Sequence, residues 1–239
     1  MSDFINTIDV LVDDAVIDSI IDRSITEFND DKIKEMGRYA LYKCTALTEL
    51  NLPNAEMLDG HSCEGCTSLT SVYLPSATKL NGENFCNCTA LTSVYVPNVT
   101  YIGKSGGTDG YNVFANCDSL VNIVLPKVES VPVATFQHCE VLERIDLPVA
   151  TKIENSFRYS FNLNTLILRN ETIVCTLTTN LCLTDSKIKR GTGYIYVPRA
   201  LIEDYKVATN WSTYATQFRA LEDYTVDGTT TGELDETKI

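Results

Sequence analysis

The sequence predicts a solenoid, a fold in which short coils of chain stack on one another around a shared elongated core. Three observations favour this class. A motif recurs at a spacing of 22 residues, its copies keep apolar residues at fixed positions, and a proline follows most copies. Self-similarity at a fixed period is typical of repeat architectures. We therefore expect one stacked array, with a helix before it and a helical cap after it.

The repeat is clearest in three consecutive copies that read Cys-Thr-Ala/Ser-Leu-Thr-x-Leu/Val-x-Leu/Val-Pro. One copy follows after a step of 29 residues instead of 22, and the last copy has lost its cysteine and its proline. The first residues of the copies are Cys44, Cys66, Cys88, Cys117, Cys139 and Ser160. The register extends back over residues 22–43 and forward to Tyr194–Pro198, whereas residues 175–192 match it poorly.

Each copy contains one short predicted strand. In the first copy, Leu50 and Leu52 point inward while Glu49 and Asn51 point outward, because side chains alternate along a strand. The proline then ends the strand, since it has no N–H to donate. A unit this short cannot close a core alone, so the strands must stack as one parallel sheet. Phe-x-x-Cys segments, with Phe85, Phe114 and Phe136, are predicted to form the opposite wall. Five residues after each proline position stands another apolar residue: Leu58, Leu80, Ile102, Val131, Ile153 and Val174.

The motif Phe-x-x-Cys-x-x-Leu-x-x-Val-x-Leu-Pro resembles the BspA-like class of leucine-rich repeats, over residues 22–198. The resemblance implies an α/β-type leucine-rich repeat solenoid, a short right-handed horseshoe with its parallel β-sheet on the concave face. It also implies adhesion or protein binding, the usual roles of the class. The sequence departs from the pattern at Leu41 and Cys63 in the Phe position, Ser160 in the Cys position and Arg169 in the Pro position.

Charge separates the ends of the chain from its middle. Residues 1–31 carry nine acids against Arg23, and residues 222–239 carry six against Lys238, while the middle is balanced. Apolar residues from Phe4 to Ile20 follow helical spacing, which predicts an amphipathic helix that caps the first coil or docks onto an assembly or a second copy. The predicted units are an acidic N-terminal helix or docking segment (1–21), the solenoid (22–198), a C-terminal cap (199–224) and an acidic tail, mobile in isolation (225–239).

Composition excludes several classes of protein. A net charge of −13 argues against nucleic-acid binding, which needs clustered Lys and Arg. The sequence shows neither a long apolar run nor a signal peptide, so we expect no membrane insertion and a location in the bacterial cytoplasm or, after assembly, in a virion.

Metal, cofactor and catalytic residues are all expected to be absent. The cysteines of Cys63-x-x-Cys66 and Cys86-x-Cys88 have the look of a zinc site, but the repeat favours buried thiols packed as small apolar groups. His61 and His138 each precede a repeat cysteine, and sequence neighbours do not give a nucleophile and base that converge.

The outward strand positions are the predicted binding site. Tyrosine there offers apolar area with a polar tip, as interface anchors do, although tyrosine and valine also simply suit strands. The predicted binding residues are Tyr73, Tyr95, Val124, Arg144, Asp146, Ile167, Tyr194 and Tyr196.

Two classes of function remain open. The first is a non-enzymatic interaction or assembly module that binds a protein partner or a surface glycan. The acidic leader and the stretch from Val197 to Trp211 make the chain similar to proteins of phages and prophages of gut Gram-positive bacteria, which suggests a virion head or tail component that binds a virion protein or the host surface. A bacterial surface adhesin is the alternative within this class. The second class is a glycan-processing enzyme or its accessory domain.

Overall fold

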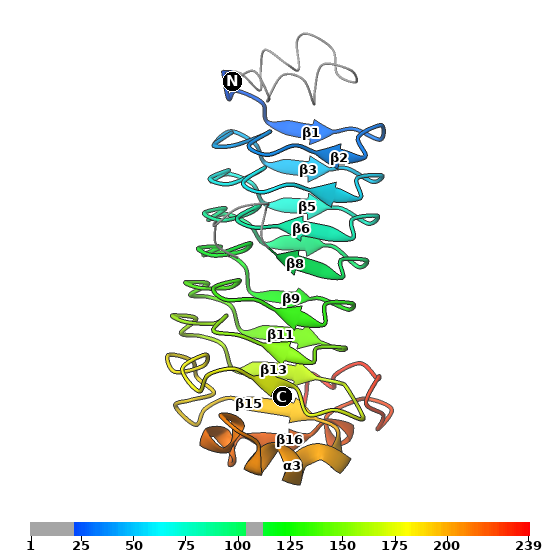
Figure 1. Cartoon of the computed structure of the whole chain (residues 1–239), viewed down its shortest axis with the longest axis vertical. Coiled ribbons are helices and arrows are strands. Elements are labelled where there is room, and N and C mark those ends of the chain that lie inside the picture. Colours follow the sequence, from blue (N-terminus) through cyan, green and yellow to red (C-terminus); the bar gives the residue numbers. More distant parts are fainter. Residues whose placement is uncertain (1–21, 104–111) are drawn as a thin grey trace.

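The computed structural model describes residues 22–103 and 112–239. The predicted N-terminal helix (1–21) lies outside the described residues, so that prediction stays open. The coils stack as an elongated column with the strands running across it (Figure 1). The column is nearly straight in this view, so the stacking of the predicted solenoid is found without a pronounced horseshoe curve.

The first four coils each contribute two short strands to two parallel sheets. Strands of the first sheet are β1 (Glu27–Asn29), β3 (Glu49–Asn51), β5 (Ser71–Tyr73) and β7 (Ser93–Tyr95). Those of the second sheet are β2 (Glu35–Met36), β4 (Met57–Leu58), β6 (Lys79–Asn81) and β8 (Tyr101–Gly103). Each residue pairs with the residue one repeat away, as Leu50 does with Val72, which confirms the predicted register. The sequence pattern predicted only the first of these two sheets.

The later coils continue both series in two further parallel sheets. One contains β9 (Asn122–Val124), β11 (Arg144–Leu147), β13 (Thr165–Leu168), β15 (Tyr194–Val197) and β16 (Phe218–Ala220). The other contains β10 (Ser130–Val131), β12 (Lys152–Ile153) and β14 (Thr176–Leu177). Ile153 pairs with Leu177, which corrects the predicted position of Val174 because this step is 24 residues long instead of about 22. Strand β16 adds to β15, so the sheet continues into the predicted cap.

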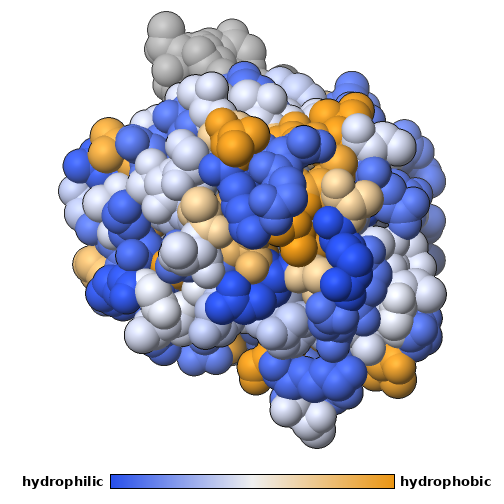
Figure 2. Space-filling model, turned by 90° about the horizontal axis from the view of Figure 1, so that it is seen from below, coloured by the Kyte–Doolittle hydropathy of each residue, from blue (hydrophilic) through white to orange (hydrophobic). Residues whose placement is uncertain are grey.

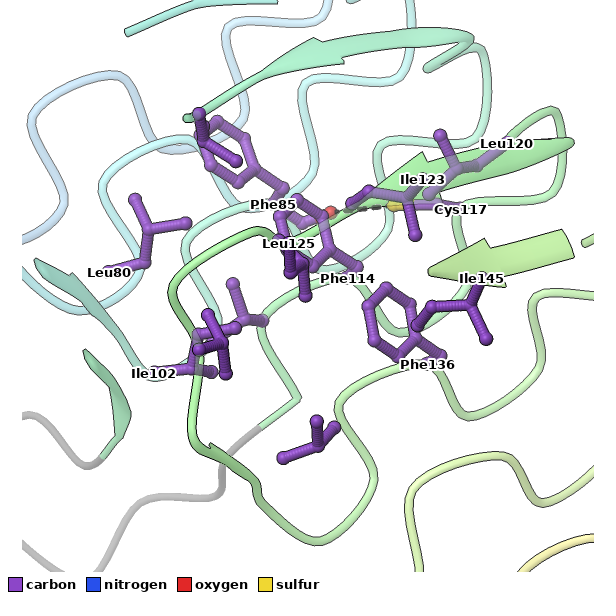
Figure 3. Close-up of a cluster of buried hydrophobic side chains, with 14 of the residues drawn as sticks. Leu80, Phe85, Ile102, Phe114, Cys117, Leu120, Ile123, Leu125, Phe136 and Ile145 are labelled. Carbon is purple, nitrogen blue, oxygen red and sulfur yellow. Dashed lines mark hydrogen bonds between the residues drawn. The ribbon is translucent and has the colours of Figure 1, made fainter. Parts of the chain in front are cut away.

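The wall opposite the first series of strands is built from stacked phenylalanines and buried thiols. Phe85, Phe114, Phe136 and Phe157 follow one another with ring centroids 5.5, 5.5 and 5.6 Å apart, and Figure 3 shows the first three. The thiol of Cys117 donates to the carbonyl of Phe85, one coil back. Ser160 replaces a cysteine but keeps this bond, because its hydroxyl donates to the carbonyl of Phe136 at 2.9 Å. Serine at the Cys position therefore preserves the coil.

One continuous apolar core runs from Ile25 to Phe218. The poorly matched segment 175–192 joins it through Cys182, Leu183 and Ile188. The consecutive coils therefore share a single elongated interior, as the repeat predicts.

Short helices close the C-terminal end of the column. They are the 3₁₀ helices η1 (Arg199–Leu201), η2 (Trp211–Tyr214) and η3 (Leu221–Asp223) and the α-helix α3 (Ile202–Val207). Tyr205 and Trp211 are buried and bond to the last coil: the hydroxyl of Tyr205 accepts from the Cys175 amide at 2.9 Å, and the indole of Trp211 donates to the Cys175 carbonyl. Figure 2 views this end, where hydrophilic side chains separate smaller apolar patches. The end of the core is thus covered, as a solenoid terminus requires.

Candidate binding face

The predicted binding residues lie in two rows along the outward side of the first strand series. One row joins Asn51, Tyr73 and Tyr95 through adjacent strands. The same row continues with Val124, Asp146, Ile167 and Tyr196. Arg144 and Tyr194 stand in the second row, two residues before Asp146 and Tyr196. The repeat therefore placed all eight predicted residues on one side of the column.

Three of these residues form what we call the open face: Tyr73, Tyr95 and Val124. Their exposed fractions are 46%, 50% and 53%, high values for large apolar side chains. The tyrosine rings stack in parallel, with centroids 5.1 Å apart and planes 8° from parallel. Each ring limits the rotation of the other, so less side-chain entropy remains to be lost when a partner binds. The open face is thus an ordered apolar surface with two hydroxyl groups.

A groove lies beside Tyr95, between β7 and β9, where one sheet ends and the next begins. Its volume is about 450 Å³, and its mostly apolar lining includes Pro97 and Pro126. Val94 lines this groove and is only half-buried, whereas its equivalents Val72 and Ile123 are buried. The second strand series is also interrupted here, between β8 and β10, whereas the Phe wall keeps its regular stacking. The groove extends the open face inward.

The other end of the row is covered, which corrects the prediction for three residues. Asp146, Ile167 and Tyr196 retain only 9%, 0% and 1% of their exposure and are not accessible to a partner in this structure. We call these three the covered face. Ile167 and Tyr196 form a second small apolar cluster with Leu221, against which Tyr224 and Leu234 pack.

The cover is the C-terminal tail, residues 224–239. Its antiparallel bridge joins Thr225 to Leu234, and the Tyr224 ring meets Tyr196 edge-on at 5.0 Å. At its end Glu236 accepts two bonds from Arg144, at 2.6 and 2.8 Å. The sequence predicted a tail that is mobile in isolation, because its composition is polar and acidic. In this structure the acidic segment contacts Arg144 and Arg169, and the charge pattern along the sequence did not predict these contacts.

A buried ion pair explains why the tail lies where it does. Arg169 forms a bidentate pair with Asp146, with bonds between 2.8 and 3.1 Å. Burial raises the pKa of Asp146 in spite of the neighbouring arginine, so removal from water is the larger effect. Arg169 directs its remaining donor at the carbonyls of Thr230 and Gly232, at 2.6 and 3.0 Å. Because a buried charge needs all its bonds satisfied, the tail completes this pair. Arg169 stands where most other coils have proline. That departure was the one sequence feature that could have indicated a contact with the tail.

Between the two faces, Arg144 and Tyr194 remain partly accessible. Tyr194 is 36% exposed and carries the guanidinium of Arg219 over its ring at 4.0 Å. The side chain of Arg144 is 29% exposed and is already paired with Glu236. The ion pair lowers the pKa of Glu236, so its stabilising effect is present above the ordinary glutamate pKa and is lost on acidification.

The cysteines and histidines considered from the sequence lie apart from this face. The thiols of Cys66 and Cys88 donate to backbone carbonyls at 3.1 and 3.3 Å, as structural thiols in the wall do. His138 stacks on Tyr159, whereas the thiol of its sequence neighbour Cys139 donates to the carbonyl of Phe114. Burial raises the pKa of Cys139 to about 12, which opposes formation of a nucleophilic thiolate at neutral pH.

The stacked parallel strands and the Phe–Cys wall define a leucine-rich repeat solenoid. The family model of the BspA type leucine-rich repeat region matches residues 22–106 and 108–189 in six copies. The chain therefore belongs to the BspA-type leucine-rich repeat family.

Two solved leucine-rich repeat proteins are similar to this chain. The Treponema pallidum leucine-rich repeat protein is 23% identical with a TM-score of 0.50, and the match covers 71% of this chain and 74% of that one. A leucine-rich cell surface protein of Faecalibacterium prausnitzii is 23% identical with a TM-score of 0.48, over 62% of this chain and 49% of that chain. This chain thus spans about half the length of the latter protein. No curated protein matches the chain. Among the described residues, no helix has the length and apolar character needed to span a membrane.

Proposed function

We propose that this chain is a non-enzymatic interaction module that binds a protein partner through the open face. The observation that carries the proposal is the exposed row of Tyr73, Tyr95 and Val124 beside an apolar groove. Aromatic anchors held in a rigid setting dominate binding energy in protein interfaces. The family supports the same assignment, since leucine-rich repeat arrays typically bind proteins.

Substitution of the stacked tyrosines tests the proposal. The double variant Tyr73→Asn/Tyr95→Asn places on both strands the residue that Asn51 already supplies at the equivalent position, so the coils should still fold. Tyr101→Asn is the matched control, because Tyr101 is 47% exposed but lies in β8, in the other sheet. Proteins from extracts of the source organism that bind to the immobilised chain are identified by mass spectrometry. The purified partner is then titrated against the unmodified chain and each variant by calorimetry.

We expect the double variant to raise the dissociation constant at least about ten-fold, since anchor residues contribute about 2 kcal/mol or more each. The Tyr101→Asn variant should bind as the unmodified chain does. If the unmodified chain, the double variant and Tyr101→Asn bind the partner with equal affinity, the open face is not the binding site. Retention of glycans instead of proteins favours the glycan-binding alternative.

The finer proposal is that the module is a component of a phage virion, present in the bacterial cytoplasm before assembly. It rests on the resemblance of the chain's ends to phage-encoded proteins. Mass spectrometry of particles purified from the source tests it: the protein should be found in stoichiometric amount, and its absence contradicts the virion role. In that case a bacterial surface adhesin is the remaining candidate.

A further inference from the structure

Three side chains that bear metal-binding atoms converge at a corner of the early coils, away from the open face. The Nδ1 atom of His61 lies 2.5 Å from Oε2 of Glu64 and 3.0 Å from Oε2 of Glu83. The side chains keep only 10%, 17% and 19% of their exposure. We call these three residues the corner cluster.

The repeat explains how these residues meet. Glu83 stands one repeat of 22 residues after His61, at the same corner of the next coil, and Glu64 follows His61 by three positions. The backbone amide of His61 donates to the carbonyl of Gly82 at 3.0 Å and holds the two coils together. The ring of Tyr39 stacks on the imidazole at 4.7 Å and fixes its orientation. The ligand atoms are thus positioned by the fold.

The corner cluster concentrates negative charge away from water. The carboxylates of Glu64 and Glu83 and the imidazole of His61 share this partly buried corner, and the side-chain amide of Asn112 donates to Glu83 at 3.3 Å. Two carboxylates held close together repel each other, so a cation between them is favourable. The field of the carboxylates reaches the neighbouring thiol: the pKa of Cys86 is raised to about 12, chiefly by burial and then by Glu64 and Glu83. A divalent cation would balance both carboxylates and accept the imidazole nitrogen as a third ligand.

We propose that His61, Glu64 and Glu83 bind a divalent transition-metal cation, with Zn²⁺ as the representative. One imidazole nitrogen and two carboxylate oxygens suit Zn²⁺ or Mn²⁺ better than Ca²⁺, which takes oxygen ligands. Ligand distances of about 2.0–2.2 Å in a tetrahedral site place the ligand atoms about 3.4 Å apart. Each carboxylate oxygen therefore needs to move away from Nδ1 of His61 by less than about 1 Å. The two glutamates are partly exposed, so a cation can reach them from solvent.

Later coils supply natural controls for the site. Ala134 and Gln137 occupy the positions equivalent to His61 and Glu64 relative to the Phe–Cys wall, and Ala134 has the same left-handed backbone, with φ of 59° against 61°. The variants His61→Ala and Glu64→Gln therefore copy residues that the coil already accommodates. His138→Ala removes the other histidine of the chain and leaves the corner cluster intact.

Calorimetric titration of the reduced full-length chain with Zn²⁺, after treatment with a chelator, tests the proposal. We expect one site with a dissociation constant of about 1 μM or lower. Affinity should fall by at least about ten-fold in His61→Ala and in Glu64→Gln and stay unchanged in His138→Ala. Circular dichroism confirms that each variant is folded. Absence of binding by the unmodified chain overturns the proposal, as does equal affinity of the cluster variants.

Substitution of Co²⁺ for Zn²⁺ distinguishes this site from cysteine ligation. Nitrogen and oxygen ligands give weak visible bands only, whereas thiolate ligands add a strong near-ultraviolet charge-transfer band. A spectrum without the thiolate band, lost in His61→Ala, supports the corner cluster. A strong thiolate band assigns the metal to the cysteines and overturns the proposal.

Discussion

At the scale of single residues, the strand pattern separates core from surface within two neighbouring positions. Leu125 is completely buried, while Val124 is 53% exposed. We expect Leu125→Ala to lower the free energy of unfolding by about 2–5 kcal/mol, because it leaves a cavity in a close-packed interior. Val124→Ala, the adjacent control, should change stability by less than about 0.5 kcal/mol. Urea denaturation measures both, and a loss below about 1 kcal/mol for Leu125→Ala contradicts its interior packing.

Residue identity at the repeated positions was largely predictable, because each position performs the same physical task in every coil. The Phe and Cys positions form the wall, and Ser160 fits since its hydroxyl replaces a thiol donor. The corner cluster was missed because His61 was compared only with its sequence neighbours. His61 and Glu83 occupy equivalent positions one repeat apart, and this equivalence could have predicted that they lie close together.

At the scale of elements, one of the contacts between the tail and the strand face is the Arg144–Glu236 ion pair, which can be removed without touching the core. We expect Glu236→Lys to loosen residues 224–236, because Arg144 then faces a like charge. Since the pair is exposed, the cost in global stability should be below about 1 kcal/mol. Hydrogen exchange measures the effect as faster exchange of the amides of Val226 and Asp235, which bond to Glu233 and Tyr224.

Glu233→Lys provides the control for this experiment. It changes the net charge by the same amount, but Glu233 is exposed and forms no ion pair among the described residues. Exchange in this variant should match the unmodified chain. Unchanged exchange in Glu236→Lys would show that the tail is held by Arg169 and the apolar cluster instead.

The docking of the tail marks the limit of what repetition predicts. Strand positions and their register follow from a period, because every coil meets its neighbour in the same way. The covered face depends on Asp146, Arg169 and the tail, which lies some 60 residues further along the chain. This contact occurs once and is not repeated from coil to coil. For that reason the pattern assigned Ile167 and Tyr196 to the surface, although they are buried.

At the scale of the whole molecule, each coil contacts only its neighbours, so stability should decrease locally when one end is damaged. Trp211→Ala removes a buried indole and its bond to the Cys175 carbonyl, which we expect to cost about 3–5 kcal/mol. The loss should fall first on the coils next to the cap. Hydrogen exchange should therefore increase more in residues 175–197 than in residues 44–103.

Val207→Ala is the control at this end of the molecule, because Val207 belongs to α3 but is 80% exposed. It should leave exchange unchanged in both regions. If Trp211→Ala raises exchange equally along the column, the coils unfold as one cooperative unit and the nearest-neighbour description is contradicted. A gradient that declines from the cap supports it, and implies that the distant open face keeps its geometry when the C-terminal end opens.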